Sequence, residues 1–396
     1  MSKKMISLSE PYLNGQEWKQ VKRCFDIGRI SSSGPDVGKF EQQICRYTKA
    51  KFAIATTSGT AALHVALLVA GVKPGNEVIV PTVTFIAPVN AVRYVNAEPV
   101  FMDADDYYNM DVEKTLTFIK NETLFKNGFT INKKTKKRIP AIIVVHVFGN
   151  AIDIDSLLDV CRKRNIAVIE DATESLGTFY KKSSLNGGLR PRSAHTGTVG
   201  DIGCFSFNGN KIITTGGGGM VVTNNPVSAQ RAKYLTTQAK DDGVYYLHHE
   251  IGYNYRLNNI QAAVGVAQLS RLNDFIRRKK ANYEYYQTQI NTIDGLHLAE
   301  TPPYAQNNCW MCVLQVDKKI YGRGRDQLMQ SFRKEGVEVR PLWHLNHWQK
   351  PYQGCQAYKI EKAYELLEKT LNIPSSVGLT KNEITKVTGL LKAWEK

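Results

Sequence analysis

The sequence predicts an α/β protein with a mainly parallel central sheet flanked by helices, and a smaller α/β domain in its C-terminal part. Two observations predict the sheet: short apolar runs alternate with segments of helical spacing, and acidic residues stand where one of those runs ends. Long helical patterns from about residue 257 predict a connection to the smaller domain. We therefore expect a large domain with the N-terminal segment over residues 1–255, and connecting helices with the smaller domain over residues 256–396.

The chain opens with two helical patterns. The first covers residues 17–27, and its predicted apolar side consists of Trp18, Val21, Cys24 and Phe25. A Ser-Gly-Pro turn then leads into a second helix that begins near Asp36. We expect the serines of this turn to be solvated loop residues.

Five runs of strand length supply the expected sheet. They are residues 52–56, 77–81, 99–103, 141–145 and 167–170. An apolar helix over residues 57–71 follows the first run and opens with small hydroxyl residues. The smaller domain is predicted to contain strands at residues 310–316 and 337–339, and helices near residues 326–335, 357–367 and 381–394.

The composition is that of an ordinary globular protein, with 42% hydrophobic and 22% charged residues. Residues 1–9 lack the apolar core of a signal peptide, and no stretch approaches roughly eighteen uninterrupted apolar residues. We therefore expect a cytoplasmic protein that does not span a membrane. Seven cysteines without regular spacing fit reduced thiols better than a disulfide framework.

A formal net charge of +16 raises the question of polyanionic partners. The basic residues form two local runs, KKTKKR at residues 133–138 and RRKK at residues 277–280, without the interleaved aromatic residues of single-strand binders. We expect the first run in a surface hairpin and the second on a solvated helix face. This pattern favours solubility and diffuse attraction of anionic substrates over nucleic-acid binding.

Cysteine and histidine pairs raise the possibility of a metal or redox site. Cys309 and Cys312 form a CxxC, but no second CxxC is present and the motif lies inside a predicted buried strand. His344 and His347 have no carboxylate or cysteine at ligand spacing. We therefore expect no metal, and we interpret the CxxC as part of the core.

The most informative stretch is DIGCFSFNGNKIITTGGGGMVVT, residues 201–223. Two buried strands are predicted here around a polar turn, one lysine and four glycines. Lys211 has few neighbours in the sequence that could pair with its charge, so desolvation would favour a neutral amine able to form an imine with a carbonyl. The alternative is a solvated turn lysine. The glycines match no phosphate-binding fingerprint, and they indicate only a close backbone approach.

Two further segments add polar groups to this picture. The strand in AVIEDATESLG ends in Glu170 and Asp171, about forty residues before Lys211, where carboxylates point into the ligand crevice of an α/β sheet. A helix N-cap is the alternative for Asp171. Gly59 and Thr60 stand at the start of an apolar helix, whose unpaired amides form a ready anion site or an ordinary cap.

Three motifs in order carry a resemblance to a known family: EDATES, then GDIGCFSFNGNKIITTGGGGMVVT, then GYNYRLNNIQAAVGVAQL. They resemble the nucleotide-sugar aminotransferases of the DegT/DnrJ/StrS family, a branch of the fold type I pyridoxal phosphate enzymes. The resemblance runs over nearly the whole chain, from ISLSEPYLNGQEW to RPLWHLNHW. It implies the fold type I architecture, with pyridoxal 5'-phosphate held as an imine on Lys211 and Asp171 keeping the ring nitrogen protonated.

The resemblance also implies roles for individual residues around the cofactor. Gly59, Thr60 and Ser206 would contact its phosphate, and Phe85 would lie against its pyridine face. Phe85 could otherwise be a core residue. Glu174 stands near the phenolic oxygen of the cofactor, where many family members carry glutamine or histidine, so its role is open.

Other residues point to a partner subunit and to the substrate. Asn254 matches an asparagine that reaches the cofactor phosphate of the neighbouring subunit, which implies a homodimer with shared active sites. Arg256 either supports that interface, binds an acidic group or is structural. Trp343 and His344 lie in an aromatic and imidazole-rich loop suited to a sugar. The segment over residues 180–198 is longer than the usual family connection.

The implied reaction is transfer of the amino group of L-glutamate to a nucleotide-linked 4-keto-6-deoxy sugar for a surface glycan such as lipopolysaccharide O-antigen. The phrase SFNGNKIITTGGGGM favours the UDP-linked 2-acetamido-4-keto-2,6-dideoxyhexose. The GDP-linked ketosugar of a perosamine synthase, or a dTDP-linked ketosugar, is the alternative. A regulator or binding module without catalysis is the rival of another class, and Lys211 with Asp171 and Ser206 speaks against it.

Overall fold

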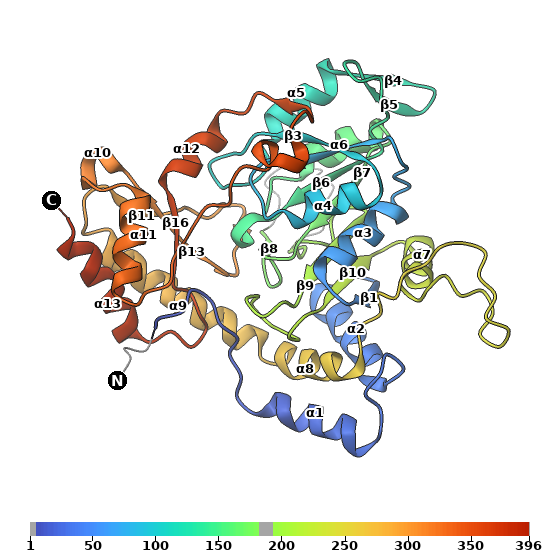
Figure 1. Cartoon of the computed structure of the whole chain (residues 1–396), viewed down its shortest axis with the longest axis horizontal. Helices are drawn as coiled ribbons and strands as arrows, with labels where there is room; N and C mark the ends of the chain where they lie inside the picture. Colours follow the sequence, from blue (N-terminus) through green and yellow to red (C-terminus); the bar gives the residue numbers. More distant parts are fainter. Residues whose placement is uncertain (1–4, 182–192, 396) are drawn as a thin grey trace.

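The computed structural model describes residues 5–181 and 193–395, and it confirms the predicted α/β fold (Figure 1). An eight-stranded sheet has the order β1-β10-β9-β7-β6-β2-β3-β15, and a four-stranded sheet has the order β11-β13-β16-β14. Pairing from β9 through β15 is parallel, whereas β10 is antiparallel to both of its neighbours. Residues 182–192 of the long segment predicted above lie outside the described residues.

Except for β15, the strands of the large sheet follow the predicted apolar runs closely. They are β1 (Phe52–Thr56), β2 (Glu77–Pro81), β3 (Glu98–Met102), β6 (Ala141–Val145), β7 (Ala167–Asp171), β9 (Ile202–Ser206), β10 (Gly219–Thr223) and β15 (Ala357–Tyr358). Along β2, Val78 and Val80 belong to one hydrophobic core while Ile79 belongs to another. Side chains therefore enter a core on each face of the sheet, as the period of two in a strand requires.

Helices cover both faces of the large sheet. Those whose buried residues join the first core include α2 (Pro35–Thr48), α3 (Gly59–Val69), α4 (Ala87–Tyr94), α7 (Pro226–Thr236) and α8 (Asn259–Leu269). The second core takes α5 (Val112–Asn121) and α6 (Asp155–Lys163). Helix α1 (Gln16–Asp26) packs along α8 at one edge of the molecule (Figure 1).

The smaller sheet has its own core. Its strands are β11 (Leu296–Leu298), β13 (Cys312–Val316), β14 (Arg340–Pro341) and β16 (Thr370–Ile373), and its helices include α9 (Leu272–Ile290), α10 (Lys318–Tyr321), α11 (Arg325–Lys334) and α13 (Lys381–Ala393). The remaining elements are α12 (Lys362–Lys369), the β4–β5 hairpin (Thr123–Lys126, Phe129–Asn132), the β8–β12 pair (Phe179–Tyr180, Ala305–Gln306) and 3-10 turns at Val147–Gly149, Asn346–Trp348 and Lys350–Tyr352.

Several element boundaries in the C-terminal part differ from the prediction. The helix expected over residues 357–367 begins only at Lys362, because Ala357 and Tyr358 pair with β3 at the edge of the large sheet. The strand expected at 337–339 is β14 at Arg340–Pro341, although Val337 makes an isolated bridge with Ile6. Both differences arise from pairing with distant segments. The boundary between residues 255 and 256 stays a prediction.

The predicted apolar side of the first helix is only partly packed inside the chain, since Cys24 is buried whereas Trp18 is 67% and Phe25 58% exposed. One surface prediction was wrong. The RRKK run is not wholly solvated, because Lys279 is only 3% exposed. The KKTKKR run does follow a hairpin strand and returns to it through an isolated bridge between Ile131 and Arg138. In residues 5–181 and 193–395, no helix has both the length and the apolar character to span a bilayer.

Candidate active site

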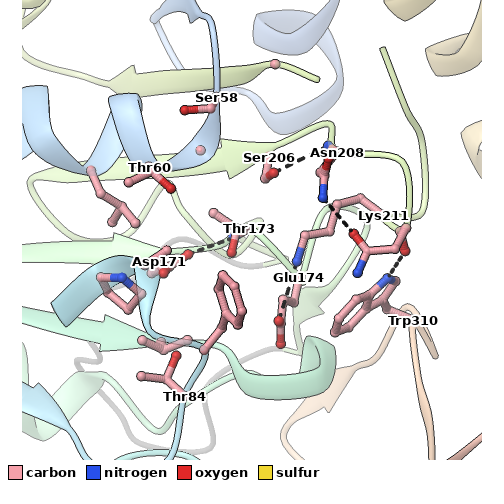
Figure 2. A pocket seen from close by; sticks show the side chains of 18 of the residues that line it. Ser58, Thr60, Thr84, Asp171, Thr173, Glu174, Ser206, Asn208, Lys211 and Trp310 are labelled. Carbon is pink, nitrogen blue, oxygen red and sulfur yellow. Dashed lines mark hydrogen bonds and ion pairs between the residues drawn. The ribbon is translucent and has the colours of Figure 1, made fainter. Parts of the chain in front are cut away.

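A cavity of about 380 Å³ lies where the carboxyl ends of β7 and β9 meet the start of α3 (Figure 2). We call it the lysine cavity, after Lys211. Eight of the predicted site residues line it: Gly59, Thr60, Phe85, Asp171, Glu174, Ser206, Lys211 and Trp343. The position at the carboxyl ends of parallel strands is the one expected for a ligand site in an α/β sheet.

The start of α3 forms one wall of the lysine cavity. Ser58 caps the helix by accepting a hydrogen bond from the N–H of Ala61 through its side-chain oxygen. Gly59 and Thr60 follow, and a Cβ atom at Gly59 would stand 2.8 Å from the Cβ of Ser206. Only glycine therefore fits between α3 and β9 without displacement, and helix amides and the positive dipole end face the cavity.

The glycine run behind this wall permits a close backbone approach, as predicted. A Cβ atom at Gly219 would lie 2.3 Å from the carbonyl oxygen of Ser58. Gly218 has φ of 151°, a conformation that other residues rarely adopt. The run thus brings β10 against the start of α3, and Gly217 and Gly218 line the lysine cavity.

Asp171 ends β7 with its side chain in the lysine cavity. Its Oδ1 accepts a hydrogen bond from the backbone N–H of Thr173 at 3.1 Å, so the local turn contact expected of a capping residue is also present. Burial raises the pKa of Asp171, while hydrogen bonds from Thr173 and the charge of Lys211 act in the opposite direction. Any cationic group that entered the cavity beside Asp171 would be stabilised.

Lys211 is less isolated than the sequence suggested. Its Nζ lies 3.4 Å from Oε1 of Glu174 and 4.4 Å from the ring centroid of Trp310 (Figure 2). The other carboxylate oxygen of Glu174 accepts the N–H of Phe148 at 2.9 Å. Burial raises the pKa of Glu174, and the charge of Lys211 opposes that rise. The expectation of an unpaired lysine was therefore wrong, because its partners are distant in sequence.

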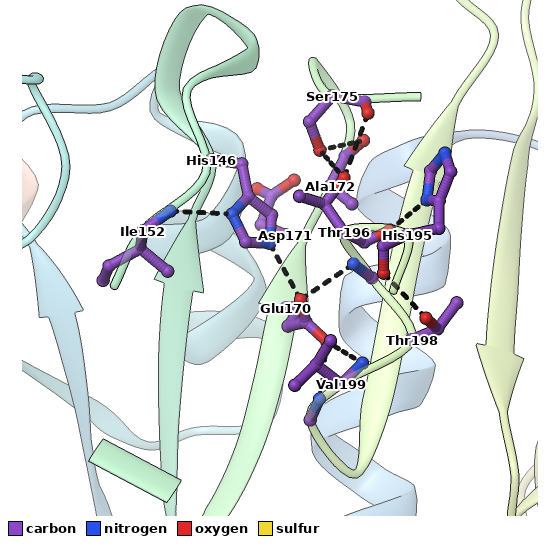
Figure 3. Close-up of polar contacts among 12 residues, drawn as sticks. His146, Ile152, Glu170, Asp171, Ala172, Ser175, His195, Thr196, Thr198 and Val199 are labelled. Carbon is purple, nitrogen blue, oxygen red and sulfur yellow. Dashed lines mark hydrogen bonds and ion pairs between the residues drawn. The ribbon is translucent and has the colours of Figure 1, made fainter. Parts of the chain in front are cut away.

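Glu170, the neighbour of Asp171, takes no part in the lysine cavity. It is fully buried and accepts hydrogen bonds from Nε2 of His146 and from the amides of Gly197, Val199 and Gly200 (Figure 3). Burial works to raise the pKa of Glu170, but these donors together hold it below its ordinary value. Glu170 therefore fixes the 197–200 segment, and only Asp171 faces the cavity.

Three predicted site residues lie outside the lysine cavity. Asn254 is exposed and forms an isolated bridge with Thr237. Arg256 bridges Thr56, and its Nε is buried without a hydrogen-bond partner among the described residues. His344 lines an adjoining cavity of about 500 Å³, which shares Trp310 and Trp343 with the lysine cavity.

Trp310 is the site residue that the sequence pattern missed. The sequence pattern predicts Trp310 inside the strand over residues 310–316, but β13 begins at Cys312 and Trp310 precedes it in the cavity wall. Its Nε1 donates to the carbonyl of Asn210, next to Lys211. The only available signal was its place at the edge of a strand. Thr173 and Asn208 also line the cavity, although no sequence pattern predicted a site role for them.

The cysteine pair is buried, in agreement with the core interpretation. Burial raises the pKa of Cys309 to about 11 and that of Cys312 to about 12, so both are neutral thiols at physiological pH. In the described part of the chain, no cluster of three or more histidine, cysteine or acidic side chains is arranged to hold a metal ion.

Comparison with known proteins agrees with this geometry. The sequence profile of the DegT/DnrJ/EryC1/StrS aminotransferase family matches residues 11–392. EpsN of Bacillus subtilis (strain 168), named as a pyridoxal phosphate-dependent aminotransferase, is 35% identical over 98% of this chain and 95% of its own length. A GDP-perosamine synthase of Caulobacter vibrioides is 36% identical over 98% of this chain and 97% of its own. A DegT DnrJ EryC1 StrS aminotransferase structure from Brucella abortus superposes with a TM-score of 0.85 at 25% identity, covering 96% of this chain and 95% of that chain. The chain therefore belongs to the DegT/DnrJ/EryC1/StrS aminotransferase family, a family of pyridoxal-phosphate-dependent sugar aminotransferases.

Proposed function

We propose that this protein transfers the amino group of L-glutamate to the ketone of a nucleotide-linked 4-keto-6-deoxy sugar. The observation that carries the proposal is the arrangement of the lysine cavity. A primary amine, a buried carboxylate and a helix N-terminus line this one cavity, contributed by Lys211, Asp171 and α3. A phosphorylated pyridine aldehyde requires these three groups for its aldehyde, ring nitrogen and phosphate.

The residues present fit the cofactor. The contact that a Cβ at Gly59 would make with Ser206 shows a wall shaped for close approach, and the helix amides and the hydroxyls of Thr60 and Ser206 are suited to the phosphate. Phe85 lines the cavity with 54% of its surface exposed, so its ring is available to cover the pyridine face. Core packing alone would not leave a phenylalanine so open.

Asp171 would hold a positive charge on the ring nitrogen. Burial raises the pKa of this carboxyl group, and a protonated ring nitrogen beside it would favour its charged form. When bound here, pyridoxal phosphate supplies an electron sink for the carbanion that forms on the donor's α-carbon. The carboxylate of Asp171 favours that electron flow by keeping the ring nitrogen protonated.

Lys211 has two tasks in this proposal. Its amine anchors the cofactor, and after the donor's nitrogen replaces it the free amine moves a proton between the donor's α-carbon and the cofactor's carbon. Glu174, 3.4 Å from Nζ, is placed to hold the lysine while it is free. The same residues then work in reverse on the sugar ketone.

The nucleotide is the finer part of the proposal. The sequence motif favoured a UDP-linked N-acetylated sugar, whereas relatives named GDP-perosamine synthase are 36% and 35% identical to this chain. We therefore carry the GDP-linked 4-keto-6-deoxymannose as an equal candidate. Trp343 and His344 line the adjoining cavity, where aromatic and imidazole groups suit a sugar nucleotide. A role in surface glycan synthesis follows from either substrate.

The proposal includes a homodimer with shared active sites. Asn254 is exposed outside the lysine cavity of its own chain, which is compatible with a contact to a second subunit. Trp18 and Phe25 on α1 are exposed, as are Tyr245 and Ile251 in the loop after α7. Apolar side chains of this size on the surface favour coverage by a partner. Sedimentation of the purified protein at several concentrations tests this part, and a monomer throughout would contradict it.

Visible absorption of the purified protein with pyridoxal phosphate tests the main proposal. We expect a band from the lysine-linked cofactor, its conversion by L-glutamate to the amine form, and its return with one member of a panel of UDP-, GDP- and dTDP-linked 4-ketosugars. Absence of the band, or the same band in Lys211→Ala, would favour the hypothesis of a regulator or binding module without catalysis. A nucleic-acid shift assay read against salt concentration then tests that rival.

A further inference from the structure

Trp310 contacts the turn that carries Lys211. Its ring centroid lies 4.4 Å from Nζ of Lys211, and its indole N–H donates to the carbonyl of Asn210 at 2.8 Å. The backbone N–H of Trp310 donates to Oδ1 of Asn308 at 2.9 Å. The indole thus faces the lysine while both its ring nitrogen and its backbone are held.

We infer that the indole ring of Trp310 binds the amine of Lys211 whenever that amine is not bonded to the cofactor, and we call this ring the platform. Lys279 is then a positioning residue, which holds Trp310 in place. The inference rests on the proposed function of Lys211. Its first support is geometric, because an ammonium group within about 6 Å of a tryptophan ring centroid is attracted to the ring face. The ring also forms part of the cavity wall, so no rearrangement is needed for the lysine to reach it.

Lys279 contacts the backbone of Trp310. Its Nζ donates to the carbonyl oxygen of Trp310 at 2.9 Å and also to the carbonyl oxygen of Ser375. The side chain is buried on α9, and among the described residues no carboxylate forms a salt bridge with it. A buried cation without a carboxylate costs folding free energy, so a lysine placed here is expected to have a use other than stability. That use is to tie Trp310 to the segment after β16.

The purely structural alternative is that Trp310 fills the core and Lys279 fills a polar gap. It does not explain why the indole lies under the ammonium of Lys211 while its N–H holds the carbonyl of the residue before that lysine. Both contacts act on the turn that carries Lys211. The platform would therefore change the energy of the free lysine, which a core role would leave unaltered.

The equilibrium of the half-reaction with L-glutamate depends on the free energy of the unbonded Lys211 amine. In it the donor's nitrogen stays on the cofactor, its carbon skeleton leaves as the 2-oxo acid with an oxygen atom from water, and Lys211 regains its free amine. The platform stabilises only the product side, where the lysine is free. Its removal should shift the equilibrium back toward the lysine-linked form.

The test is the equilibrium constant of this half-reaction, read from visible absorption of the holoenzyme in mixtures of L-glutamate and 2-oxoglutarate. We expect Trp310→Leu to lower the constant roughly 2- to 30-fold, the range of a cation–π contact. Trp310→Phe keeps a ring and should recover part of the loss. Trp394→Leu, which removes a tryptophan packed against the core of the smaller sheet, is the matched control and should leave the constant unchanged.

A double-mutant cycle then tests Lys279. Lys279→Met should lower the constant in the parent enzyme but have no further effect in the Trp310→Leu background, since it acts through the platform. The control is Arg277→Met, an exposed change in the same helix. If Lys279→Met does not fold, Lys279→Gln keeps one amide donor and replaces it in the cycle.

The outcomes separate the inference from the proposed function. An unchanged constant in Trp310→Leu, with the lysine-linked band intact, would overturn the platform and leave the proposed function standing. An equal effect of Lys279→Met in both backgrounds would overturn the positioning role. A parent enzyme without the lysine-linked band would instead refute the proposed function.

Discussion

Glu170 and Asp171 are consecutive carboxylates at the end of β7, and they face opposite sides of the strand. Glu170 accepts from His146 and three backbone amides, and its pKa is held low in spite of complete burial. Asp171 accepts hydrogen bonds from Thr173, and burial raises its pKa. The difference teaches that saturation with donors marks the structural side of the strand, and a shortage of donors marks the side prepared for a ligand.

Lys211→Ala is the strongest test of the cavity side. We expect the glutamate half-reaction to slow by about 10⁴-fold or more, because the anchor and the proton-transfer amine are lost together. The melting temperature should change little, since Lys211 lies in the cavity wall. Stopped-flow absorption and thermal unfolding measure the two effects. Lys334→Ala, on the exposed end of α11, is the control, and an equal rate in Lys211→Ala would contradict the assignment.

Asp171→Asn should separate activity from stability most clearly. An amide cannot balance a protonated ring nitrogen, so we expect the half-reaction to slow by about 10²- to 10³-fold. Stability should be unchanged or improved, because a raised pKa in the folded state means that folding disfavours the charged carboxylate. Urea unfolding at pH 7 checks this. If Asp171→Asn lost as much stability as Glu170→Gln, the proposed difference between the two sides of β7 would be contradicted.

Glu170→Gln should show the reverse pattern. It leaves three backbone amides and His146 around a side chain with only one acceptor oxygen, which costs about 3 kcal/mol of unfolding free energy. The folded fraction should keep its half-reaction rate within a few-fold. Because its folded pKa is lowered, Glu170 contributes stability at neutral pH that is lost as the pH falls through that pKa. The variant should therefore lose less stability on acidification than the parent.

Lys279 extends the comparison to a buried cation that has carbonyl acceptors but no counter-charge. Burial lowers its pKa from 10.5 to about 8, so between these values the folded state binds fewer protons than the unfolded chain. Its contribution to stability therefore rises with pH over this window. We expect the stability of the parent relative to Lys279→Met to increase by up to about 3 kcal/mol from pH 7 to pH 10. The facing thiols, Cys309 and Cys312, have raised pKa values and stay largely neutral there.

The same unfolding measurements on Arg277→Met should show no such pH trend, because that side chain is 78% exposed. If the stability difference between the parent and Lys279→Met also did not change with pH, Lys279 would keep its proton in the folded state over this pH range. The buried cation would then resemble Glu170, with its charge stabilised by its surroundings.

Features that depend on residues close together in the sequence could be predicted, and features that depend on distant residues could not. The strands, the start of α3 and the pairing of Lys211 with a carboxylate in one cavity depend on patterns within single segments and on the geometry of parallel sheets. The partners of Lys211 could not be predicted, because Glu174 and Trp310 arrive from other parts of the chain. The burial of Lys279 depends on carbonyls of residues 310 and 375, which helical spacing cannot report.

Glu174→Gln addresses the remaining ambiguity on the cavity side, where one carboxylate does have a partner. The substitution keeps an acceptor for the N–H of Phe148 and removes the charge that lies 3.4 Å from Lys211. Free Lys211 should lose about 0.5–1 kcal/mol of stabilisation, so the glutamate half-reaction should shift about 2- to 5-fold toward the lysine-linked form. Burial raises the pKa of Glu174, and its carboxylate becomes protonated as the pH falls, so the parent should approach the variant at low pH. Absorption measured across pH checks both points. If the parent and Glu174→Gln had the same equilibrium constant at every pH, Glu174 would be neutral in the enzyme. Trp310 would then be the contact that stabilises the free amine of Lys211.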